Sequence, residues 1–82
     1  MLIAQQIRAA RALLGWSQSE LSQAANVGIA TIKRIEIQEE SIRANTNTLR
    51  RIEIALVASG IKFVDDDGQY GPGVRFRQPK DA

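Results

Sequence analysis

This chain of 82 residues holds no Cys and no His. The side chains that could do chemistry are therefore hydrogen-bond donors and cations. Thiolate nucleophiles, disulfides and Cys/His zinc sites are therefore excluded. The Ser residues and carboxylates are scattered and have no orienting partner in view, so we expect neither an enzyme nor a metal or cofactor site. Four side chains suit contacts with phosphates and base edges: Gln18, Thr31, Lys33 and Arg34.

Two short helices joined by a tight turn are predicted to position these side chains. The first begins at Ser17, an N-cap residue with Glu20 at the capping-box spacing. Asn26 tolerates the left-handed backbone conformation with which a helix ends and turns. A second helix is predicted from about Gly28, and its apolar residues recur on one face: Ile29, Ile32 and Ile35. Two helices with a short turn between them form the helix-turn-helix pattern.

Two further helices are predicted on either side of this stretch. The first covers about residues 3–14, because its apolar residues recur at helical spacing and Gly15 follows. The last is capped near Asn45 and runs to Ser59. The polar segment 37–47 lacks helical periodicity after its first few residues. The preceding helix is therefore expected either to run on somewhat or to give way to an irregular turn.

The period changes beyond the last helix, where apolar and basic residues alternate as they do in β-strands. Strands are predicted near residues 61–64 and 73–77, and the resulting hairpin is expected to pack over Ile54 and Val57. Its turn contains three consecutive carboxylates, Asp65–Asp67, which are faintly similar to the start of a calcium loop. The later bidentate Glu of such a loop is missing, so we expect a solvated turn.

The chain is long enough for one domain, and its 44% apolar content is typical of a globular protein. We expect a helix-turn-helix domain over residues 1–60, a hairpin extension over 61–78 and a frayed tail at 79–82. No apolar run approaches the roughly 18 residues of a membrane span, and the N-terminus does not resemble a signal peptide, so a cytoplasmic protein is expected. The net charge of +2 is spread without a long basic run, which argues against a binder that ignores nucleic-acid sequence.

The stretch from Ser17 to Glu36 resembles the helix-turn-helix of the phage-repressor and Cro family of transcription regulators, the XRE type. The residues that carry the resemblance are Ser17, Gln18, Glu20, Leu21, Ala25, Val27, Thr31, Ile32, Ile35 and Glu36. Residues 7–11 and 48–56 also fit the family's first and last core helices. The resemblance implies a mainly α fold, a compact lambda-repressor-like domain of four helices, here extended by a C-terminal β-hairpin. Gly28 stands where the family usually has Ser or Thr, so the cap of the second helix should be weaker.

The resemblance also implies sequence-specific binding of double-stranded DNA. The helix from Gly28 would enter the major groove N-terminus first and bring five residues near base edges or flanking phosphates: Ile29, Ala30, Thr31, Lys33 and Arg34. Gln18 would hold a phosphate with its amide. In the family, the loop after this helix lies against the DNA backbone. Its donors to phosphate would be Arg43, Asn45 and Asn47. Glu39 and Glu40 should be turned away from the DNA.

Arg11 has two interpretations. It is either a solvated charge on the first helix or, as the resemblance implies, the partner of Glu36 in an ion pair that ties the first and third helices together. A pair of this kind adds specificity more surely than stability.

Two functions of different classes fit the sequence. The first is a transcriptional regulator, expected to be a repressor, that reads a pseudo-palindromic operator through the major groove. The second is a small helical protein-interaction module, such as an antitoxin-like or regulator-binding partner. A protein-binding version would be acidic or largely apolar on the exposed side of residues 28–36. Thr31, Lys33 and Arg34 lie there instead, which favours DNA.

A homodimer is expected, because one module of this size contacts too few bases for high affinity. The predicted hairpin leaves a strand edge unpaired, and such an edge recruits another chain unless it is blocked. Ile54 and Val57 add apolar surface beside it. Residues 61–77 are therefore expected to contribute to the dimer interface.

Overall fold

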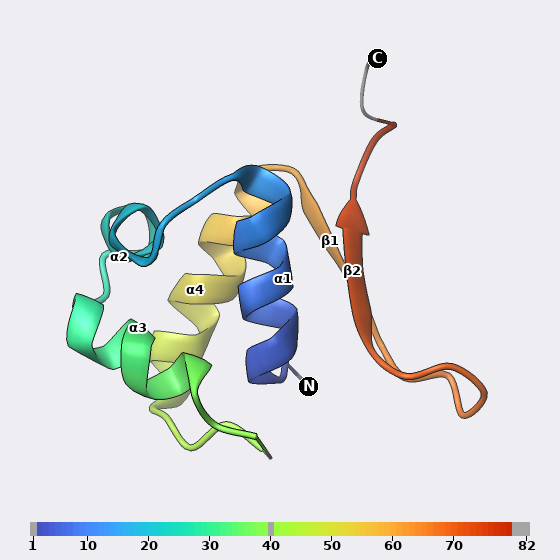
Figure 1. Ribbon diagram of the computed structural model, residues 1–82, viewed down its shortest axis with the longest axis horizontal. Helices are drawn as coiled ribbons and strands as arrows, with labels where there is room; N and C mark the ends of the chain where they lie inside the picture. Colours follow the sequence, from blue (N-terminus) through green and yellow to red (C-terminus); the bar gives the residue numbers. More distant parts are fainter. Residues whose placement is uncertain (1, 40, 80–82) are drawn as a thin grey trace.

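The computed structural model describes residues 2–39 and 41–79, which form four helices followed by a two-stranded antiparallel sheet (Figure 1). This is the mainly α architecture with a C-terminal hairpin that the sequence predicts. In chain order the elements are α1 (Ala4–Leu14), α2 (Gln18–Ala25), α3 (Ile29–Glu36), α4 (Thr46–Ala58), β1 (Ile61–Val64) and β2 (Gly73–Phe76). The predicted orientation of Glu40 and the predicted fraying of residues 80–82 lie outside the described residues.

Capping residues set the limits of α2 and α3. Ser17 Oγ accepts a hydrogen bond from the Glu20 N–H, and the Ser17 N–H donates to Glu20 Oε1, both at 3.0 Å. This is the capping box that the sequence predicts. Asn26 ends α2 in the left-handed conformation, with a φ of 55°. Gly28 begins α3 without a side-chain hydrogen bond, so the cap of α3 is the weaker of the two.

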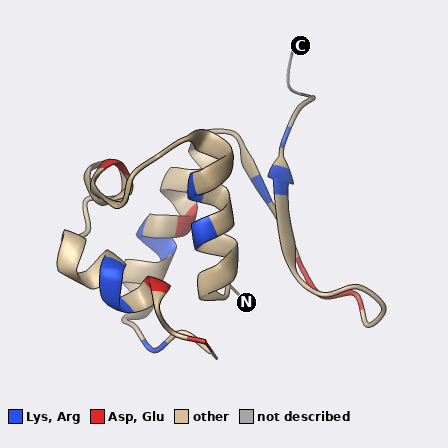
Figure 2. Ribbon diagram, viewed as in Figure 1, with Lys and Arg blue, Asp and Glu red and all other residues tan. Residues whose placement is uncertain are grey.

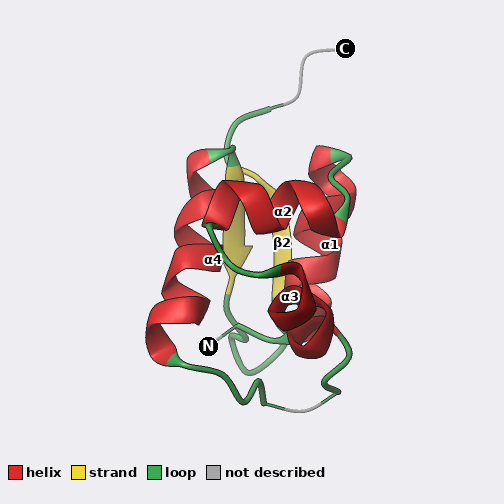
Figure 3. Cartoon of the chain, turned by 90° about the vertical axis from the view of Figure 1, so that its left-hand side faces the viewer, coloured by secondary structure: helices red, strands yellow, loops and turns green. Residues whose placement is uncertain are grey.

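α1 and α4 lie in the middle of the molecule, with α2 and α3 on one side of them and the hairpin on the other (Figure 1 and Figure 3). Their apolar faces meet in one core, whose buried members are Ile7, Ala10, Leu21, Ala25, Val27, Ile32, Ile35, Ile52, Leu56 and Ile61. Full burial of one Ile or Leu side chain contributes roughly 1.5–3 kcal/mol to stability. The core therefore holds all four helices and β1 together.

The hairpin pairs Ile61 of β1 with Phe76 of β2. Alternate side chains pack against the helices, as strand spacing predicts: Ile61, Phe63 and Val74. The expectation that the hairpin covers Ile54 is wrong, because 59% of that side chain is exposed. β2 contacts α1 while β1 contacts α4, so the hairpin straddles both helices and leaves Ile54 uncovered.

Gln6 explains why the hairpin lies across α1. Its side chain is buried, and its amide Nε2 donates to the carbonyl oxygens of Val64 at 3.2 Å and Gly73 at 3.0 Å. Its Oε1 accepts from the Ile3 N–H at 3.0 Å. A buried amide is stable only when its polar atoms are paired, and here both ends of the amide are. Gln6 thus attaches the hairpin to the start of α1.

The loop of the hairpin bends at residues 68–70, and Asp66 and Asp67 accept hydrogen bonds from its backbone. Asp66 Oδ1 accepts from the Gly68 N–H at 2.7 Å. Asp67 Oδ1 accepts from the N–H groups of Tyr70 at 2.6 Å and Gln69 at 2.9 Å. These bonds, that from Tyr70 first, lower the pKa of Asp67.

Arg11 and Glu36 form the ion pair between α1 and α3 that the resemblance implies. Arg11 Nε and Nη2 donate to Glu36 Oε2 and Oε1, each at 2.7 Å, and Arg11 Nη1 donates to the Trp16 carbonyl at 2.9 Å. Only 2% of the Glu36 side chain is exposed, against 19% for Arg11. The hydrogen bonds to Glu36 raise the pKa of Arg11, so the guanidinium stays charged throughout the neutral range.

Replacing Arg11 by Ala should destabilise the fold, because it leaves the Glu36 carboxylate buried without its cation. We expect the free energy of unfolding in urea at pH 7 to fall by about 3–5 kcal/mol. Arg51→Ala is the matched control, since Arg51 is exposed on α4 and its loss should change stability by no more than about 0.5 kcal/mol. Equal losses in the two variants would show that the pair contributes no more than a surface charge.

Low pH should destabilise the hairpin turn, because the Asp67 carboxylate becomes protonated. Because the pKa of Asp67 is lowered from its ordinary value of 3.8, the ionised turn is fully stabilised above about pH 4 and loses this contribution as pH falls through the lowered pKa. The amide NMR shifts of Gln69 and Tyr70 should therefore titrate below about pH 4. In Asp67→Asn, which keeps an acceptor oxygen without the charge, the same amides should show no such titration. A titration that persists in this variant would assign the effect to another carboxyl.

Candidate nucleic-acid interface

The helix α3 has one face in the core and one face toward solvent. Ile32 and Ile35 are buried, and the residues between and before them point outward because successive side chains turn by about 100° around the helix. Four of the five predicted contact residues on α3 are exposed: Ile29, Ala30, Lys33 and Arg34. The fifth, Thr31, is half-buried. The structure therefore brings these five residues together on one turn-and-a-half of helix.

Gln18 lies beside the last residue of α3, although it belongs to the first turn of α2. Its Nε2 donates to Glu36 Oε1 at 3.2 Å, so the carboxylate that binds Arg11 also orients this amide. The sequence predicts only a phosphate contact for Gln18 and contains no signal for this bond. One N–H of the same amide remains for another acceptor. The phosphate contact of Gln18 stays a prediction.

Arg8 is a further residue of this region to which the sequence assigned no role. Its Nη1 donates to the backbone carbonyl of Glu36, at the C-terminal end of α3. A cation at this end of a helix satisfies a free carbonyl and interacts favourably with the helix dipole. Arg8 and Arg11 lie three positions apart on α1, the helical spacing that puts both side chains on one face. Together they anchor the C-terminal end of α3.

The chain after α3 is irregular in its described residues, 37–39 and 41–45, which decides between the two courses that the sequence left open for the end of α3. The side chain of Gln38 joins this segment to the end of α3. Its Oε1 accepts from the Arg43 N–H at 2.7 Å, and its Nε2 is 3.4 Å from the Arg34 carbonyl. Asn45 then caps α4, with its Oδ1 accepting from the Asn47 N–H at 2.8 Å. All three predicted phosphate donors in this region have exposed side chains: Arg43, Asn45 and Asn47.

The positive charge of α3 and that of the following segment lie on the same side of the molecule (Figure 2). Glu36, the acidic residue of α3, is buried in its ion pair, so the exposed face of this helix carries Lys33 and Arg34 without a neighbouring acid on the same helix. Within residues 2–39 and 41–79, no ion pair engages either cation. Glu39 is exposed in the segment that follows.

This arrangement offers cationic and amide donors on a convex helical surface, a chemistry that suits phosphate oxygens and the acceptors of base edges. In the part of the chain that the structure describes, no three His, Cys, Asp or Glu side chains come together in a way that could hold a metal ion. None of the described helices combines the length and apolar character needed to cross a membrane.

Comparison with known proteins identifies the fold family. A family model described as helix-turn-helix matches residues 7–56, which run from α1 through most of α4. No curated protein matches the chain significantly. The matched segment covers more than half of the chain and includes all of α2 and α3 and most of α1 and α4. The chain therefore belongs to the XRE-type family of DNA-binding helix-turn-helix regulators.

Proposed function

We propose that this protein is a repressor that binds double-stranded DNA as a homodimer, with α3 in the major groove of each half of a pseudo-palindromic operator. The observation that carries the proposal is the exposed face of α3, where Lys33 and Arg34 point outward while the acid of the same helix is buried. Repression requires only that the operator be occupied, whereas activation requires a further contact with the transcription machinery. Two modules supply the affinity that one module of this size lacks.

Arg34 is the residue proposed to read a base. Its guanidinium is exposed on the face of α3 opposite Ile32 and Ile35, and it is long enough to reach guanine O6 and N7 together. Thr31 and Lys33 lie on the same helix and add contacts to base edges or to flanking phosphates. Ile29 and Ala30, at the end that enters the groove first, suit apolar contact such as that with a thymine methyl group.

The backbone of the DNA is proposed to bind the residues that flank α3. Gln18 and Arg43 would donate to phosphates on either side of the groove, and Asn47 would extend the row along the start of α4. Asn45 uses its side-chain oxygen to cap α4, so only its Nδ2 group is left to donate to phosphate. These contacts set the register of the helix without selecting a sequence.

Arg34→Ala should lower affinity mainly for the preferred operator, because it removes a base contact worth about 1–3 kcal/mol of discrimination. Binding to the selected operator and to its single-base variants is measured by titration at fixed salt, and the preference at one position per half-site should flatten. Arg43→Ala is the matched control, which should weaken every sequence alike and reduce the slope of log K against log salt. If Arg34→Ala lowers affinity equally for all variants, Arg34 contacts phosphate only and the reading role passes to Thr31 and Lys33.

Gln18→Ala should weaken binding to all sequences to the same degree, because the proposed phosphate contact carries no sequence information. Since Gln18 also donates to the buried carboxylate of Glu36, the unfolding free energy of the variant is measured beside its affinity. Titration at a temperature where the variant is fully folded separates the two effects. A change in base preference would instead give Gln18, or the orientation of α3 that it supports, a part in reading the sequence.

A further inference from the structure

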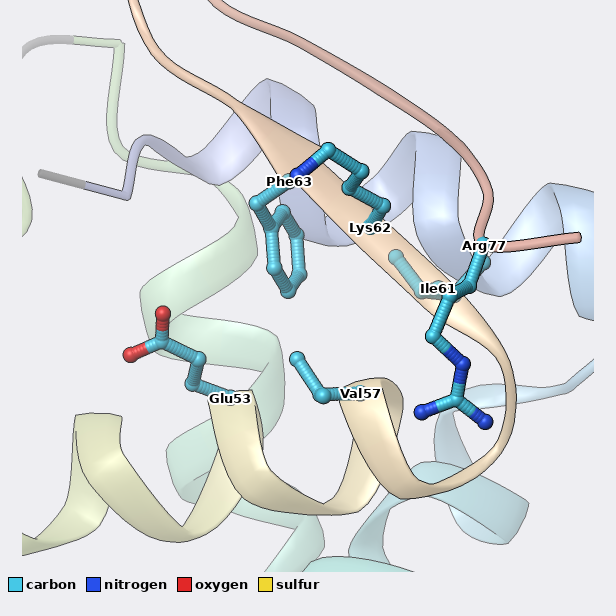
Figure 4. A pocket seen from close by; sticks show the side chains of 6 residues that line it. All are labelled: Glu53, Val57, Ile61, Lys62, Phe63 and Arg77. Atoms are coloured by element: carbon cyan, nitrogen blue, oxygen red, sulfur yellow. The ribbon is translucent and has the colours of Figure 1, made fainter.

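One surface of the protein exposes apolar side chains although the hairpin lies beside it. On α4, 59% of Ile54 and 37% of Val57 are exposed. Val57 and Phe63 point toward one another across a cleft between α4 and β1 (Figure 4). We call Ile54 and the residues that line this cleft the α4–β1 face; the lining residues are Glu53, Val57, Ile61, Lys62, Phe63 and Arg77. The cleft measures about 290 Å³. Exposed apolar side chains that lie together beside charged ones are typical of a protein-binding surface.

Charged side chains flank the apolar centre of this face at opposite ends. Glu53 lies at one end of the cleft, one helical turn before Val57, and Arg77 lies at the other (Figure 4). No ion pair joins the two within the described chain. Lys62, the remaining charged residue of the lining, is exposed on β1 and alternates with Ile61 and Phe63, which face the helices. Along the cleft the order of acid, apolar centre and base is self-complementary. When two such faces meet around a two-fold axis, Glu53 of each copy faces Arg77 of the other. Both acids therefore meet bases.

The edge of β1 is less suited to a second copy than the sequence alone indicates. Packed helices lie about 8–10 Å apart, whereas neighbouring strands lie about 4.7–4.9 Å apart. Here α1 and α4 already cover the two strands of the sheet, so the helical layer is wider than the sheet. A copy that continued the sheet would drive its own helices into α4. The contact is therefore expected through α4 and the adjoining cleft, with the strand edge contributing side chains only.

We propose that the α4–β1 face binds a second copy of this chain around a two-fold axis. Glu53 of each copy lies against Arg77 of the other, and Ile54, Val57 and Phe63 form the apolar centre. In Figure 3 the helix α3 faces the viewer while α4 forms one flank of the molecule. A rotation of 180° about the viewing direction joins two such flanks and leaves both α3 helices facing the viewer. The dimer thus presents both helices to one side, as a palindromic duplex requires.

This inference deepens the homodimer of the proposed function, which it rests on, but its test needs no DNA. Full-length chain is sedimented over a range of concentrations. Ile54→Asp should raise the dimer dissociation constant by about 100-fold, because it places a charge at the apolar centre twice per dimer. Ile37→Asp is the matched control: Ile37 is also an exposed isoleucine, 75% exposed, and lies after α3, so the dimer should persist. Circular dichroism checks that both variants are folded.

Reversal of the flanking charges tests the pairing of the two ends. Glu53→Arg and Arg77→Glu should each raise the dissociation constant by about tenfold, because each sets like charges against one another in both contacts. The double variant, with both reversals, should return to within about threefold of the wild type, since every pair is opposite in sign again. Point variants are used because deleting the hairpin would also remove Ile61, a core residue that is only 1% exposed.

A wild-type chain that sediments as a monomer at its highest soluble concentration overturns the inference. A dimer that survives Ile54→Asp, or a charge-reversed double variant that stays as weak as the single variants, overturns it as well. Operator titration separates these outcomes from the proposed function. A monomer in sedimentation that still binds its operator with base preference contradicts only the dimer face. A dimer that binds no duplex contradicts only the proposed function.

Discussion

The arrangement of the first three helices depends on one buried carboxylate, that of Glu36. A buried carboxylate without a partner costs several kcal/mol, so Glu36 is stable in the interior only because Arg11 binds both of its oxygens and Gln18 donates to one of them. These donors come from α1 and α2, while the acceptor ends α3. Bidentate charged hydrogen bonds are strongly directional. The site therefore selects one relative orientation of three helices, which apolar contacts alone would specify less sharply.

The same group compensates for the weakness of α3 itself. A helix of eight residues is too short to be stable alone, and Gly28 begins it without a side-chain cap. Its support comes from the other end: Ile32 and Ile35 are buried, Glu36 is paired, and Arg8 binds the final carbonyl. α3 is thus held along its inner face and at its C-terminus. Its first turn stays exposed, which is the part that a helix entering a groove must leave accessible.

Local signals in the sequence were sufficient for the helix limits other than the end of α3, because caps act between neighbours. The capping box of Ser17 and Glu20 and the left-handed Asn26 are local signals of this kind, and the structure contains both. Gln6 shows the limit of prediction from neighbouring residues. A Gln within an amphipathic helix is normally exposed, and the carbonyls that bury this one are 58 and 67 residues away in the chain. No local pattern marks such partners.

The exposure of Ile54 has a similar cause. An apolar residue beside a predicted hairpin is reasonably expected to be covered, but the hairpin is also bonded to α1 through Gln6, and no pattern along α4 indicates that contact. The contact residues of α3 and its flanks were open to prediction for the opposite reason. They are exposed side chains whose direction follows from helical geometry and from the family resemblance, without any need to know distant packing.

α1 is the element that connects these two sides of the molecule. Arg8 and Arg11 reach from it to the C-terminus of α3, and Gln6 reaches from it to the hairpin. Positions 8 and 11 are one helical turn apart and share a face, whereas position 6 is rotated by about 200° from position 8. One straight helix therefore directs its charged side chains toward the helix-turn-helix and its buried amide toward the strands. α3 and the hairpin are therefore both attached to α1 by directional hydrogen bonds, while α4 is held against α2 and β1 by the apolar core.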